Sequence, residues 1–482
     1  GRGPTTPVWP VSDGEVPMAQ LNSTTVTGTA VAEFRSEFAG QVLEPGDSGY
    51  DQARTVVNPL VDLRPRVIAQ CETVDDVVRA VRFGREHDLE IAVRGGGHGV
   101  GGEALTDGGI VIDLRRMSEV TVNPEEANAR VSGGATMGHL DRAAQPYGLA
   151  TTGGRVSTIG VCGLVLNGGS GWLDRRFGLA CDNLLAAELV TADGDVVRAS
   201  PEENPELFWA LHGGGGNFGV VTSMTLRLHE LPSVNVSLLL WDAEAGPDVV
   251  RAYREFMGAS TDDVCGGLMY MTAPSEDFVP LWLVGRLVCA VLLIHTGRDP
   301  DEVARDLQPM REAGHVAEMS AEMAYADVQC LLDGPPGYHT YWSAEHVTTL
   351  PDEAVDRYCA GAQRMPAPSP SQYLLAPQGG TVSRALTDYP IPWRYAAWGV
   401  YPFGVWRDAA DEERVVQWAQ SVRAEMSPWA TGAVYLSVAG DEEEHRMVSG
   451  FGGWDNYHRL ARVKAQYDPE NVFHRNPNIK PA

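Results

Sequence analysis

Three glycine-rich loops contain the residues whose types and spacing are best suited to binding a ligand. They span 94–102 (RGGGHGVGG), 153–171 and 212–219 (HGGGGNFG). Glycine costs conformational order, so clusters of it are expected where the backbone needs positive φ or approaches a ligand closely. Exposed backbone amides can bind a pyrophosphate without lysine, and this chain has lysine only at Lys464 and Lys480. Ordinary tight turns would give the same composition, so both interpretations remain open on the loops alone.

Two of these loops satisfy a dinucleotide-binding pattern, but only literally. Residues 97–102 and 214–219 both read GxGxxG. That fingerprint must open a helix, whereas both loops are expected to lead into further loop and strand. A Rossmann nucleotide site is therefore not predicted.

The segments that flank the loops alternate between strand and helix patterns. Thr73 precedes acids and valines at helical spacing, which predicts a capped helix from about 74 to 87. Further strands are expected in 64–71, 89–93, 109–114 and 220–228, and a helix in 137–148. After Pro232 the pattern indicates a second layered domain. Its expected strands are 234–241, 281–296 and 431–438, its helices lie around 301–313, 351–363 and 410–425, and turns with one helix follow in 441–482.

The composition disfavours several classes of partner. Lys and Arg number 37 and Asp and Glu 64, a net charge of −27, which repels nucleic acid and anionic lipid. No apolar run approaches the ~18 residues needed to cross a bilayer. We therefore expect a soluble, cytoplasmic protein with no nucleic-acid or membrane partner. Residues 1–25 lack periodicity and a signal-peptide pattern, and are expected to form a loose arm.

Cysteine and histidine spacing predicts no metal site. The seven cysteines include no CxxC pair, so neither a zinc ribbon nor a disulfide framework is indicated, and most are expected to be buried free thiols. His212, His295, His339 and His346 show no metal-ligand spacing, and we assign them no role.

Four long motifs in sequence order identify a family resemblance. They are RGGGHGVGG, TTGGRVSTIGVCGLVLNGGSGWLDRRFGLACDNLLAAELVTADGDVV, NPELFWALHGGGGNFGVVT and NYHRLARVKAQYDPENVFHRNPNI. They resemble the berberine bridge enzyme-like branch of the vanillyl-alcohol oxidase and p-cresol methylhydroxylase superfamily, closely over 65–230 and 453–479 and loosely over 234–440.

The resemblance implies an α+β fold with two domains. A two-lobed FAD-binding domain is expected in 26–232, and an antiparallel-sheet substrate domain flanked by helices in 233–440. Residues 441–482 are expected to return to the FAD-binding domain. The cofactor would be FAD, bonded covalently through His98 to a methyl group of the isoalloxazine ring.

The resemblance also implies the remaining cofactor contacts, which fall in the three loops and the C-terminal segment. In the first loop they are Arg94, Gly95, Gly96, Gly97 and Gly99. In the second they are Thr152, Gly153, Gly154, Thr158, Gly160, Gly163, Asn167 and Gly168. Val220 and Val221 would lie on the adenine side, and Asn476 and Asn478 would close against the flavin.

Two positions depart from the family pattern. Many relatives form a second covalent link through a cysteine at the position that here is Val156, and Cys162 is better explained as a small packing residue. Relatives often carry Asp, Glu or Tyr three residues before a Gly-Gly pair, where this chain has Ala376. Tyr373 and Gln378 lie close enough in sequence to substitute for it.

Tyr457 matches a position that lies over the flavin in sugar- and alcohol-oxidising relatives. A phenol with a lowered pKa could accept a proton as hydride leaves carbon, although a tyrosine packed beneath the C-terminal segment would give the same sequence. Aromatic residues that could line a substrate pocket, or equally serve core packing, are Trp172, Tyr395, Trp398, Tyr401, Trp406 and Trp454.

These features predict an FAD-dependent oxidase of a small organic substrate, a natural-product intermediate or a sugar. Molecular oxygen would take the electrons and form hydrogen peroxide. Residues 161–173 (VCGLVLNGGSGWL) also resemble the enterocin-pathway flavoenzyme, so an oxygenase acting on a polyketide-type intermediate is the alternative. An FAD-bound binding protein without redox activity is a third. The sequence leaves the oligomeric state open.

Overall fold

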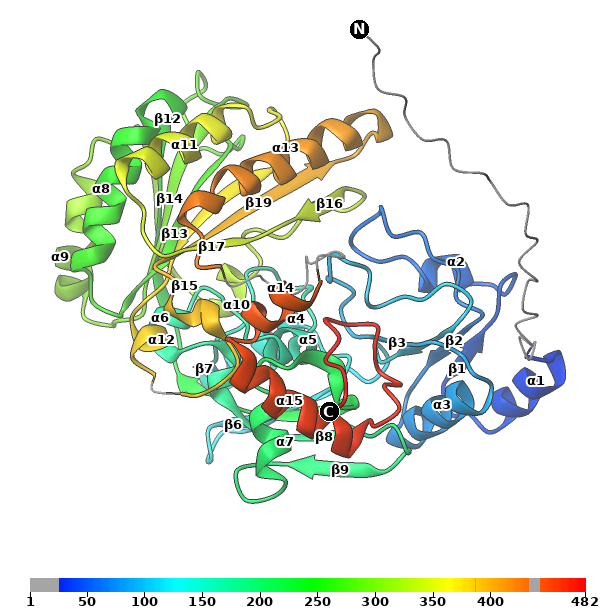
Figure 1. Ribbon diagram of the computed structural model, residues 1–482. Helices are drawn as coiled ribbons and strands as arrows, with labels where there is room; N and C mark the ends of the chain where they lie inside the picture. Colours follow the sequence, from blue (N-terminus) through cyan, green and yellow to red (C-terminus); the bar gives the residue numbers. More distant parts are fainter. Residues whose placement is uncertain (1–25, 386, 433–442) are drawn as a thin grey trace, which may run out of the picture.

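The computed structural model describes residues 26–385, 387–432 and 443–482 (Figure 1). The expected N-terminal arm, 1–25, lies outside these residues. Residues 433–438, most of the strand that the sequence predicts in 431–438, also lie outside the described residues. Three main sheets organise the described residues. The first glycine-rich loop joins two strands of the first sheet, and the second and third loops each precede a strand of the second sheet.

The first sheet is small and mostly parallel, with strand order β1-β2-β4-β3. Its three parallel strands are nearly continuous apolar runs, as expected of strands buried on both faces. Thr73 and Asp76 form a reciprocal capping box at the start of α3, as the sequence predicts. The elements are α1 (Gly28–Ser36), β1 (Gln41–Leu43), α2 (Tyr50–Ala53), β2 (Val67–Gln70), α3 (Val74–Glu86), β3 (Ile91–Arg94) and β4 (Ile110–Asp113).

The second sheet is antiparallel, with order β5-β6-β10-β8-β9. Its strands are β5 (Val120–Asn123), β6 (Asn128–Ser132), β8 (Leu184–Val190), β9 (Val196–Ala199) and β10 (Val220–Arg227). Its helices are α4 (Met137–Ala144), α5 (Val161–Leu166), α6 (Asp174–Phe177) and α7 (Pro205–Ala210). A separate two-stranded ribbon pairs β7 (Leu149–Ala150) with β11 (His229–Glu230).

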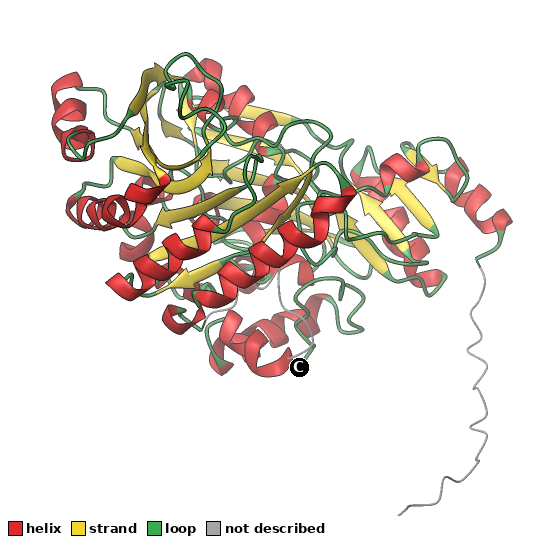
Figure 2. Cartoon of the chain, turned by 90° about the horizontal axis from the view of Figure 1, so that it is seen from above, coloured by secondary structure: helices red, strands yellow, loops and turns green. Residues whose placement is uncertain are grey.

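The third sheet has eight antiparallel strands, in the order β15-β12-β14-β13-β18-β19-β16 with β17 also paired to β19. Long helices cover one face of this sheet (Figures 1 and 2). The strands are β12 (Val234–Asp242), β13 (Val264–Thr272), β14 (Leu287–His295), β15 (Ala317–Met323), β16 (His339–Trp342), β17 (Glu345–Val347), β18 (Gln372–Pro377) and β19 (Trp398–Trp406). The helices are α8 (Gly246–Ala259), α9 (Pro300–Arg311), α10 (Tyr325–Val328), α11 (Asp352–Gln363), α12 (Thr381–Arg384) and α13 (Glu412–Glu425).

Alternate side chains of the third sheet serve different cores. In β18, Tyr373 and Leu375 pack beneath the helices, whereas Leu374 and Ala376 join the opposite core with Trp172. Trp172 comes from the end of the second glycine-rich segment, so this second face looks toward the glycine loops. We call it the loop-facing side of the sheet.

The C-terminal residues contain two helices, α14 (Glu443–Gly450) and α15 (Trp454–Tyr467), where the sequence predicts one. Gly452 and Gly453 have φ of 89° and 111°, which separates the two helices. In Figure 1, α15 lies beside α7. Arg459 forms an ion pair with Glu206 of α7 at 2.8 Å and lies over the Trp209 ring.

The predicted α+β fold class is confirmed, and most predicted elements are found within a few residues. One exception is 281–286, where a strand was expected and the chain turns instead. The Leu283 amide donates to the Pro280 carbonyl and Gly285 has φ of 78°, so β14 starts only at Leu287. No helix among the described residues combines the length and apolar character needed to cross a membrane.

Candidate cofactor site

The first two glycine loops press directly against each other. A Cβ on Gly160 would lie 2.6 Å from the Gly96 amide nitrogen, which is closer than Cβ atoms approach other atoms in proteins. Gly97, with φ of 71°, then reverses the chain after β3. Glycine is therefore required at these positions, because the two backbones meet without side chains between them.

His98 follows this contact, and its imidazole reaches the second loop. Nε2 lies 3.0 Å from Thr158 Oγ1. The Trp342 indole nitrogen, from β16 of the third sheet, donates to the His98 carbonyl at 3.2 Å. Burial lowers the pKa of His98 to about 4, although a hydrogen bond to the Thr158 backbone and the charge of Asp333 act in the opposite direction. The ring is therefore neutral at pH 7 and carries one lone pair.

Side chains from the 233–440 region also hold the second loop. Gln329 donates its amide to the Gly154 carbonyl at 2.7 Å. The Asp333 carboxylate accepts from the Ser157 amide at 2.7 Å and from its hydroxyl at 2.5 Å. These contacts were not predicted from the sequence, because Gln329, Asp333 and Trp342 lie in no motif and approach the loop only when the chain folds.

Several residues expected to contact the cofactor use their side chains within the protein. The Arg94 guanidinium donates to the carbonyls of Ala53 and Thr55, and burial lowers its pKa to about 10. The Thr152 hydroxyl donates to the Gly178 carbonyl at 2.7 Å. The side chains of Arg94 and Thr152 therefore already donate to protein carbonyls, although Arg94 Nε has no partner among the described residues.

The rest of the second loop forms α5 and the turn after it. A Cβ on Gly163 would meet no atom within 4 Å. The Asn167 side chain donates to the Gly163 carbonyl at 2.8 Å and lies 3.3 Å from the Cβ position of Gly215, in the third loop. Gly168 has φ of 97° and packs against Trp393. Gly153 packs against Met137, and Gly154 against Ile159.

The third loop is bound by the C-terminal residues. The Asn217 side chain donates to the Pro477 carbonyl and accepts from the Ile479 amide, both at 3.0 Å. Asn476 donates to the Gly216 carbonyl at 3.3 Å. Among the described residues, the buried Oδ1 atoms of Asn476 and Asn478 accept no hydrogen bond. Two orphaned acceptors beside a glycine loop fit a missing ligand with hydrogen-bond donors.

Lys464 holds the same junction from the interior. Its ammonium group is fully buried and donates to the Asn217 and Phe473 carbonyls, both at 2.8 Å, and to the Asp468 carboxylate at 2.6 Å.

Val220 and Val221 follow the third loop in β10 and are buried in two different cores. Loops one, two and three and the C-terminal residues therefore converge on one region.

The three expected catalytic side chains are not brought together. Tyr373 lies on the helix-covered side of the third sheet, where its hydroxyl donates to the Val422 carbonyl at 3.3 Å. This position turns it away from the glycine loops, which argues against contact with a cofactor. Gln378 is 4% exposed, and its amide has no hydrogen-bond partner among the described residues. Tyr457 packs beside Phe451 and Trp454, and its hydroxyl accepts from the Lys480 amide at 3.4 Å.

Ala376 lies on the loop-facing side of the sheet, where Gly399 and His346 occupy the matching positions of the next two strands. Gly399 pairs with Ala376 on one side and with His346 on the other. The Tyr401 ring folds over Gly399, with its hydroxyl 2.7 Å from the Cβ position of that glycine and 3.2 Å from His346 Nε2. The sequence assigned no role to His346, because strand pairing alone brings it beside Ala376.

Burial keeps the His346 and Tyr401 side chains neutral. It lowers the pKa of His346 to about 3, an effect that the charge of Arg155 increases, and it raises the pKa of Tyr401. Arg155 lies over the Tyr401 ring at 5.0 Å and over Trp172 at 5.4 Å, and its guanidinium donates to Ser170. Arg155 thus connects the second loop to the sheet.

The other candidate aromatic residues differ in position. Trp398 and Trp406 lie in the core beneath the helices, so they do not line the loop-facing side. Tyr395 and Trp454 are 59% and 44% exposed.

Cys162 is buried in α5 among apolar side chains, and burial raises its pKa to about 12. That environment suits a packing residue and disfavours a thiolate. Five more of the seven cysteines are buried as expected, whereas Cys330 is exposed.

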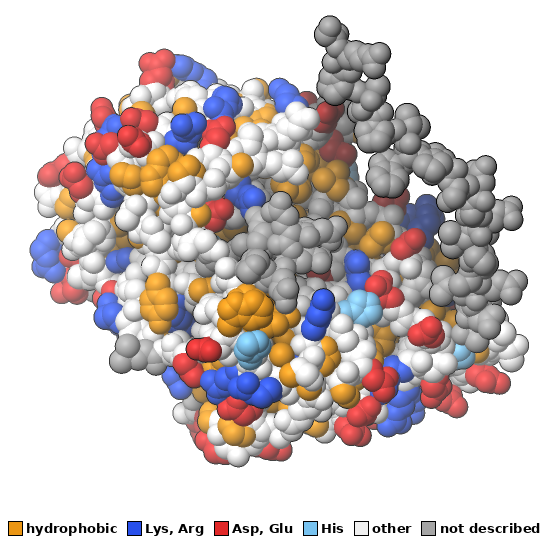
Figure 3. Space-filling view, in the orientation of Figure 1, with side chains coloured by type: hydrophobic (Ala, Val, Ile, Leu, Met, Phe, Trp, Pro, Cys, Tyr) orange, Lys and Arg blue, Asp and Glu red, His pale blue; other side chains and the backbone are white. Residues whose placement is uncertain are grey.

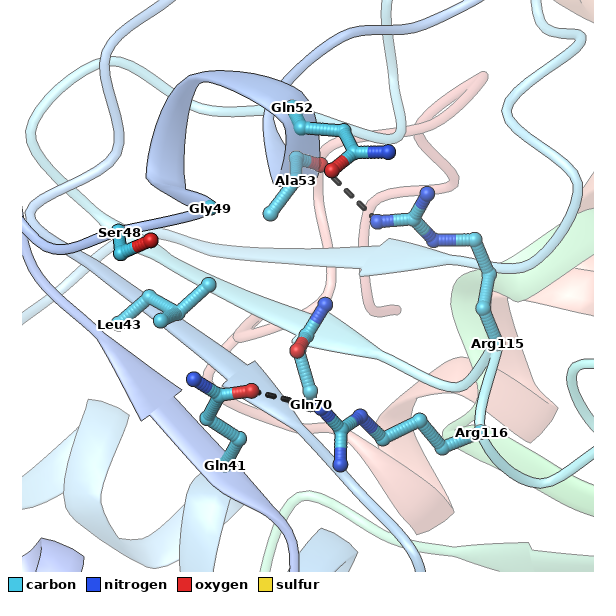
Figure 4. A pocket seen from close by; sticks show the side chains of 9 residues that line it. All are labelled: Gln41, Leu43, Ser48, Gly49, Gln52, Ala53, Gln70, Arg115 and Arg116. Carbon is cyan, nitrogen blue, oxygen red and sulfur yellow. Dashed lines mark hydrogen bonds between the residues drawn. The ribbon is translucent and has the colours of Figure 1, made fainter.

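A separate pocket of about 360 Å³ lies at the edge of the first sheet (Figure 4). Arg115 and Arg116 line it. Asp113 binds the Arg115 guanidinium at 2.7 Å, and Glu72 binds that of Arg116 at 2.8 Å. Because both guanidinium groups already have carboxylate partners, we assign no ligand to this pocket. On the face shown in Figure 3, acidic and basic side chains of the described residues are interspersed.

Two parts of the chain match known protein families. Residues 65–200 match the FAD binding domain family, and 440–480 match the family described as berberine and berberine like. The (R)-6-hydroxynicotine oxidase of Paenarthrobacter nicotinovorans is 33% identical over 464 residues, 92% of this chain and 97% of that protein.

Solved structures of the same kind share the fold. The crystal structure of 6-hydroxy-D-nicotine oxidase from Arthrobacter nicotinovorans superposes with a TM-score of 0.80 at 30% identity, covering 92% of this chain and 98% of that one. The berberine bridge enzyme of Eschscholzia californica gives 0.79 at 20% identity, covering 94% and 99%. The second likeness supports the fold alone.

Proposed function

The chain belongs to the berberine bridge enzyme-like family of FAD-dependent oxidoreductases, and from this we propose a covalent-flavin oxidase of a small organic molecule. FAD would be bonded to His98, and molecular oxygen would accept the electrons and form hydrogen peroxide. The observation that carries the proposal is the position of His98. It extends a neutral imidazole from the junction of two glycine loops that meet without side chains between them.

The residues at this junction suit the parts of FAD. Backbone amides of 95–99, 160, 162 and 163 would hold the pyrophosphate, since nearby glycines leave the backbone accessible, whereas the Val161 amide already donates to Ala135. The buried Oδ1 atoms of Asn476 and Asn478 would accept hydrogen bonds from the flavin ring. Bound FAD supplies the redox chemistry by accepting a hydride equivalent from the substrate.

The protein's own residues must position the substrate and move its proton. The loop-facing side of the sheet offers the hydrogen-bonded His346–Tyr401 pair beside Ala376, which could orient a polar substrate, whereas a pKa of about 3 makes His346 a weak base. Gln378 offers an amide that has no partner in the part of the chain that the structure describes, and this amide could orient a polar substrate. Tyr457 remains a proposed proton acceptor. Tyr373 would serve the core beneath the helices.

The substrate class follows from the missing carboxylate at Ala376. Without that base, a substrate whose proton is already acidic, such as a phenol or a β-dicarbonyl carbon, would be favoured over a plain sugar. The 33% identical relative is named for oxidation of 6-hydroxynicotine, so hydroxylated nitrogen heterocycles belong in the same set.

The test is a screen for peroxide release with the purified protein. Phenols, β-dicarbonyl compounds, 6-hydroxynicotine enantiomers and oligosaccharides would be supplied with oxygen. We expect peroxide in proportion to substrate consumed, and only for the first three groups. Efficient turnover of oligosaccharides alone would contradict the substrate proposal. Labelled oxygen in the product would identify the oxygenase alternative, and a flavin that no reductant or substrate bleaches would support the non-redox binding protein.

A further inference from the structure

Arg155 brings a positive charge to the loop-facing side of the third sheet. Its guanidinium carbon lies 5.0 Å from the centre of the Tyr401 ring and 5.4 Å from that of Trp172. Trp172 lies 3.5 Å from the Cβ position of Gly267 in β13, and the Tyr401 ring folds over a second glycine, Gly399. The cation and the two rings therefore pack together against the sheet. We call Arg155, Trp172 and Tyr401 the Arg155 cluster.

The charge of Arg155 is only weakly balanced. The carboxylate of Asp174 lies 3.9 Å from the guanidinium, and its oxygen also accepts from the Ser170 hydroxyl at 2.7 Å. Arg155 itself donates to the Ser170 hydroxyl at 2.9 Å and to the carbonyls of Ser170 and Gly171, both at 3.4 Å. Its partners are thus mostly neutral. The two arginines of the pocket at the first sheet differ, because they bind carboxylates at 2.7 and 2.8 Å.

Two buried N–H groups of the Arg155 cluster have no acceptor within residues 26–385, 387–432 and 443–482. They are Nε of Arg155 and Nε1 of Trp172. The two residues are 8% and 1% exposed, so bulk water does not reach these atoms. Buried donors are nearly always hydrogen-bonded, and one left without a partner costs about 1–3 kcal/mol. Two adjoining side chains that both lack an acceptor therefore fit a ligand that carries one.

The neighbouring positions of the sheet carry no negative charge. Ala376 stands where relatives often hold Asp, Glu or Tyr, and Gly399 and His346 are its neighbours across the strands. A carboxylate at Ala376 would repel an anion, and alanine removes this repulsion. The Arg155 cluster therefore suits an anionic group better than a cation.

We propose that the Arg155 cluster binds the ionised oxygen of the substrate, a phenolate or an enolate, through the Arg155 guanidinium and the Trp172 indole N–H. Hydrogen bonds from a guanidinium to an anionic oxygen are stronger than those between neutral groups. The inference rests on the proposed function and deepens it, because it gives the charge of the bound substrate and the residues that recognise it. A substrate bound as its anion has already released this proton to water, so no carboxylate is needed at Ala376 to remove it.

The tyrosines and the histidine around Arg155 keep their charge over the pH range in which an acidic phenol ionises. Burial raises the pKa of the three nearby tyrosines, Tyr253, Tyr325 and Tyr401. It lowers the pKa of His346 to about 3. These groups therefore stay neutral from about pH 6 to 9. Burial also raises the pKa of Asp174, an effect that the charge of Arg155 opposes, so a neutral ligand of the same shape is needed as a control.

The test measures binding of 4-nitrophenol to the full-length, flavin-loaded protein, because the anion of this probe is yellow and its neutral form is not. Its methyl ether, 4-nitroanisole, has the same ring and no ionisable group. For the wild type, we expect the affinity for 4-nitrophenol to rise as the probe ionises, while the affinity for 4-nitroanisole stays constant. The difference spectrum of the bound probe should show the anion at a pH where the free probe is mostly neutral.

Four variants separate the charge of the cluster from its shape. R155M removes the cation and should weaken binding of the anion at least about tenfold, the scale of one hydrogen bond to a charged group, without changing the affinity for 4-nitroanisole. R155K keeps the charge and should lose less affinity than R155M. W172F removes the indole N–H and should weaken binding of the anion about threefold. R286M is the matched control and should change neither affinity, because Arg286 is 57% exposed and lies over Trp282 at 5.8 Å, outside the cluster.

Equal affinity of wild type and R155M for the anion would overturn the inference, as would a wild type that binds neither ligand or prefers the neutral one. An equal loss of both ligands in R155M would indicate a purely structural role for Arg155 and would also overturn it. Failure of the proposed function gives a different result. A protein that binds the anion through Arg155 but releases no peroxide with any substrate would overturn the oxidase and leave the anion site intact.

Discussion

The glycine-loop junction and the loop-facing side of the third sheet face each other, but their residues are distributed differently along the sequence. At the junction, the important residues lie within short motifs, and the contacts of Gly96 with Gly160 and of His98 with Thr158 join two of those motifs. On the sheet, Ala376, Gly399 and His346 are far apart in sequence and meet only through strand pairing. Local sequence thus specifies the proposed cofactor side of the site, whereas tertiary structure specifies its proposed substrate side.

The largest expected effect is the loss of covalent flavin in H98A. His98 extends from the contact between the first two glycine loops, so acid-precipitated H98A should be colourless while wild type stays yellow. C162A is the matched control and should retain all its covalent flavin, because Cys162 is buried with a raised pKa. Flavin that remains bonded in H98A would assign the attachment to another residue.

The next effect tests how the C-terminal residues support the junction. Lys464 is fully buried with Asp468, and breaking a buried pair costs about 3–5 kcal/mol. K464M should therefore lower the free energy of unfolding by that amount, as measured by urea denaturation, and weaken FAD binding. Lys480 is exposed, so K480M should change stability by less than about 0.5 kcal/mol. Equal stability of the two variants would show that the buried ammonium contributes nothing.

Sequence reasoning predicts the fold class and the local elements well for a physical reason. The capping box at Thr73 and the glycines at 95–97 depend on contacts within a few residues or on one repeated backbone requirement. Gln329, Asp333 and Trp342 could not be predicted in the same way, because each acts on a loop more than 170 residues away. The sequence could not place Tyr373 on the helix-covered side, because its distance in sequence from Gly379 says nothing about which face of β18 it occupies.

A smaller effect distinguishes the two faces of the third sheet. Y401F removes the hydroxyl bonded to His346, and we expect it to slow anaerobic flavin reduction by about tenfold, the scale of one lost hydrogen bond. Y373F removes a hydroxyl on the helix side and should cost about 1 kcal/mol of stability without slowing reduction. The measurement is stopped-flow reduction with a substrate from the peroxide screen. Slower reduction in Y373F than in Y401F would reverse the assignment of the faces.

The smallest expected effect is the pH dependence of flavin attachment between pH 7 and 5. Burial lowers the pKa of His98 to about 4 from an unfolded value of about 6.5, so the folded ring stays neutral down to that pH. The attachment rate should therefore change less than about twofold from pH 7 to 5 and fall only toward pH 4. A steep loss centred near pH 6.5 would mean that the imidazole is exposed to water. The stability of the folded protein changes in the same direction as the attachment rate. The contribution of the neutral His98 ring to the free energy of unfolding is complete above about pH 6.5 and is lost as the pH falls toward 4.

The central claim is that His98 is the single covalent anchor of FAD, and peptide mapping of the wild-type protein tests it most directly. The protein is denatured in acid, digested with a protease and analysed by mass spectrometry. We predict that the mass of FAD appears on the peptide containing His98 and is absent from the peptide containing Cys162. Flavin released into the supernatant, or found on the Cys162 peptide, would contradict the account.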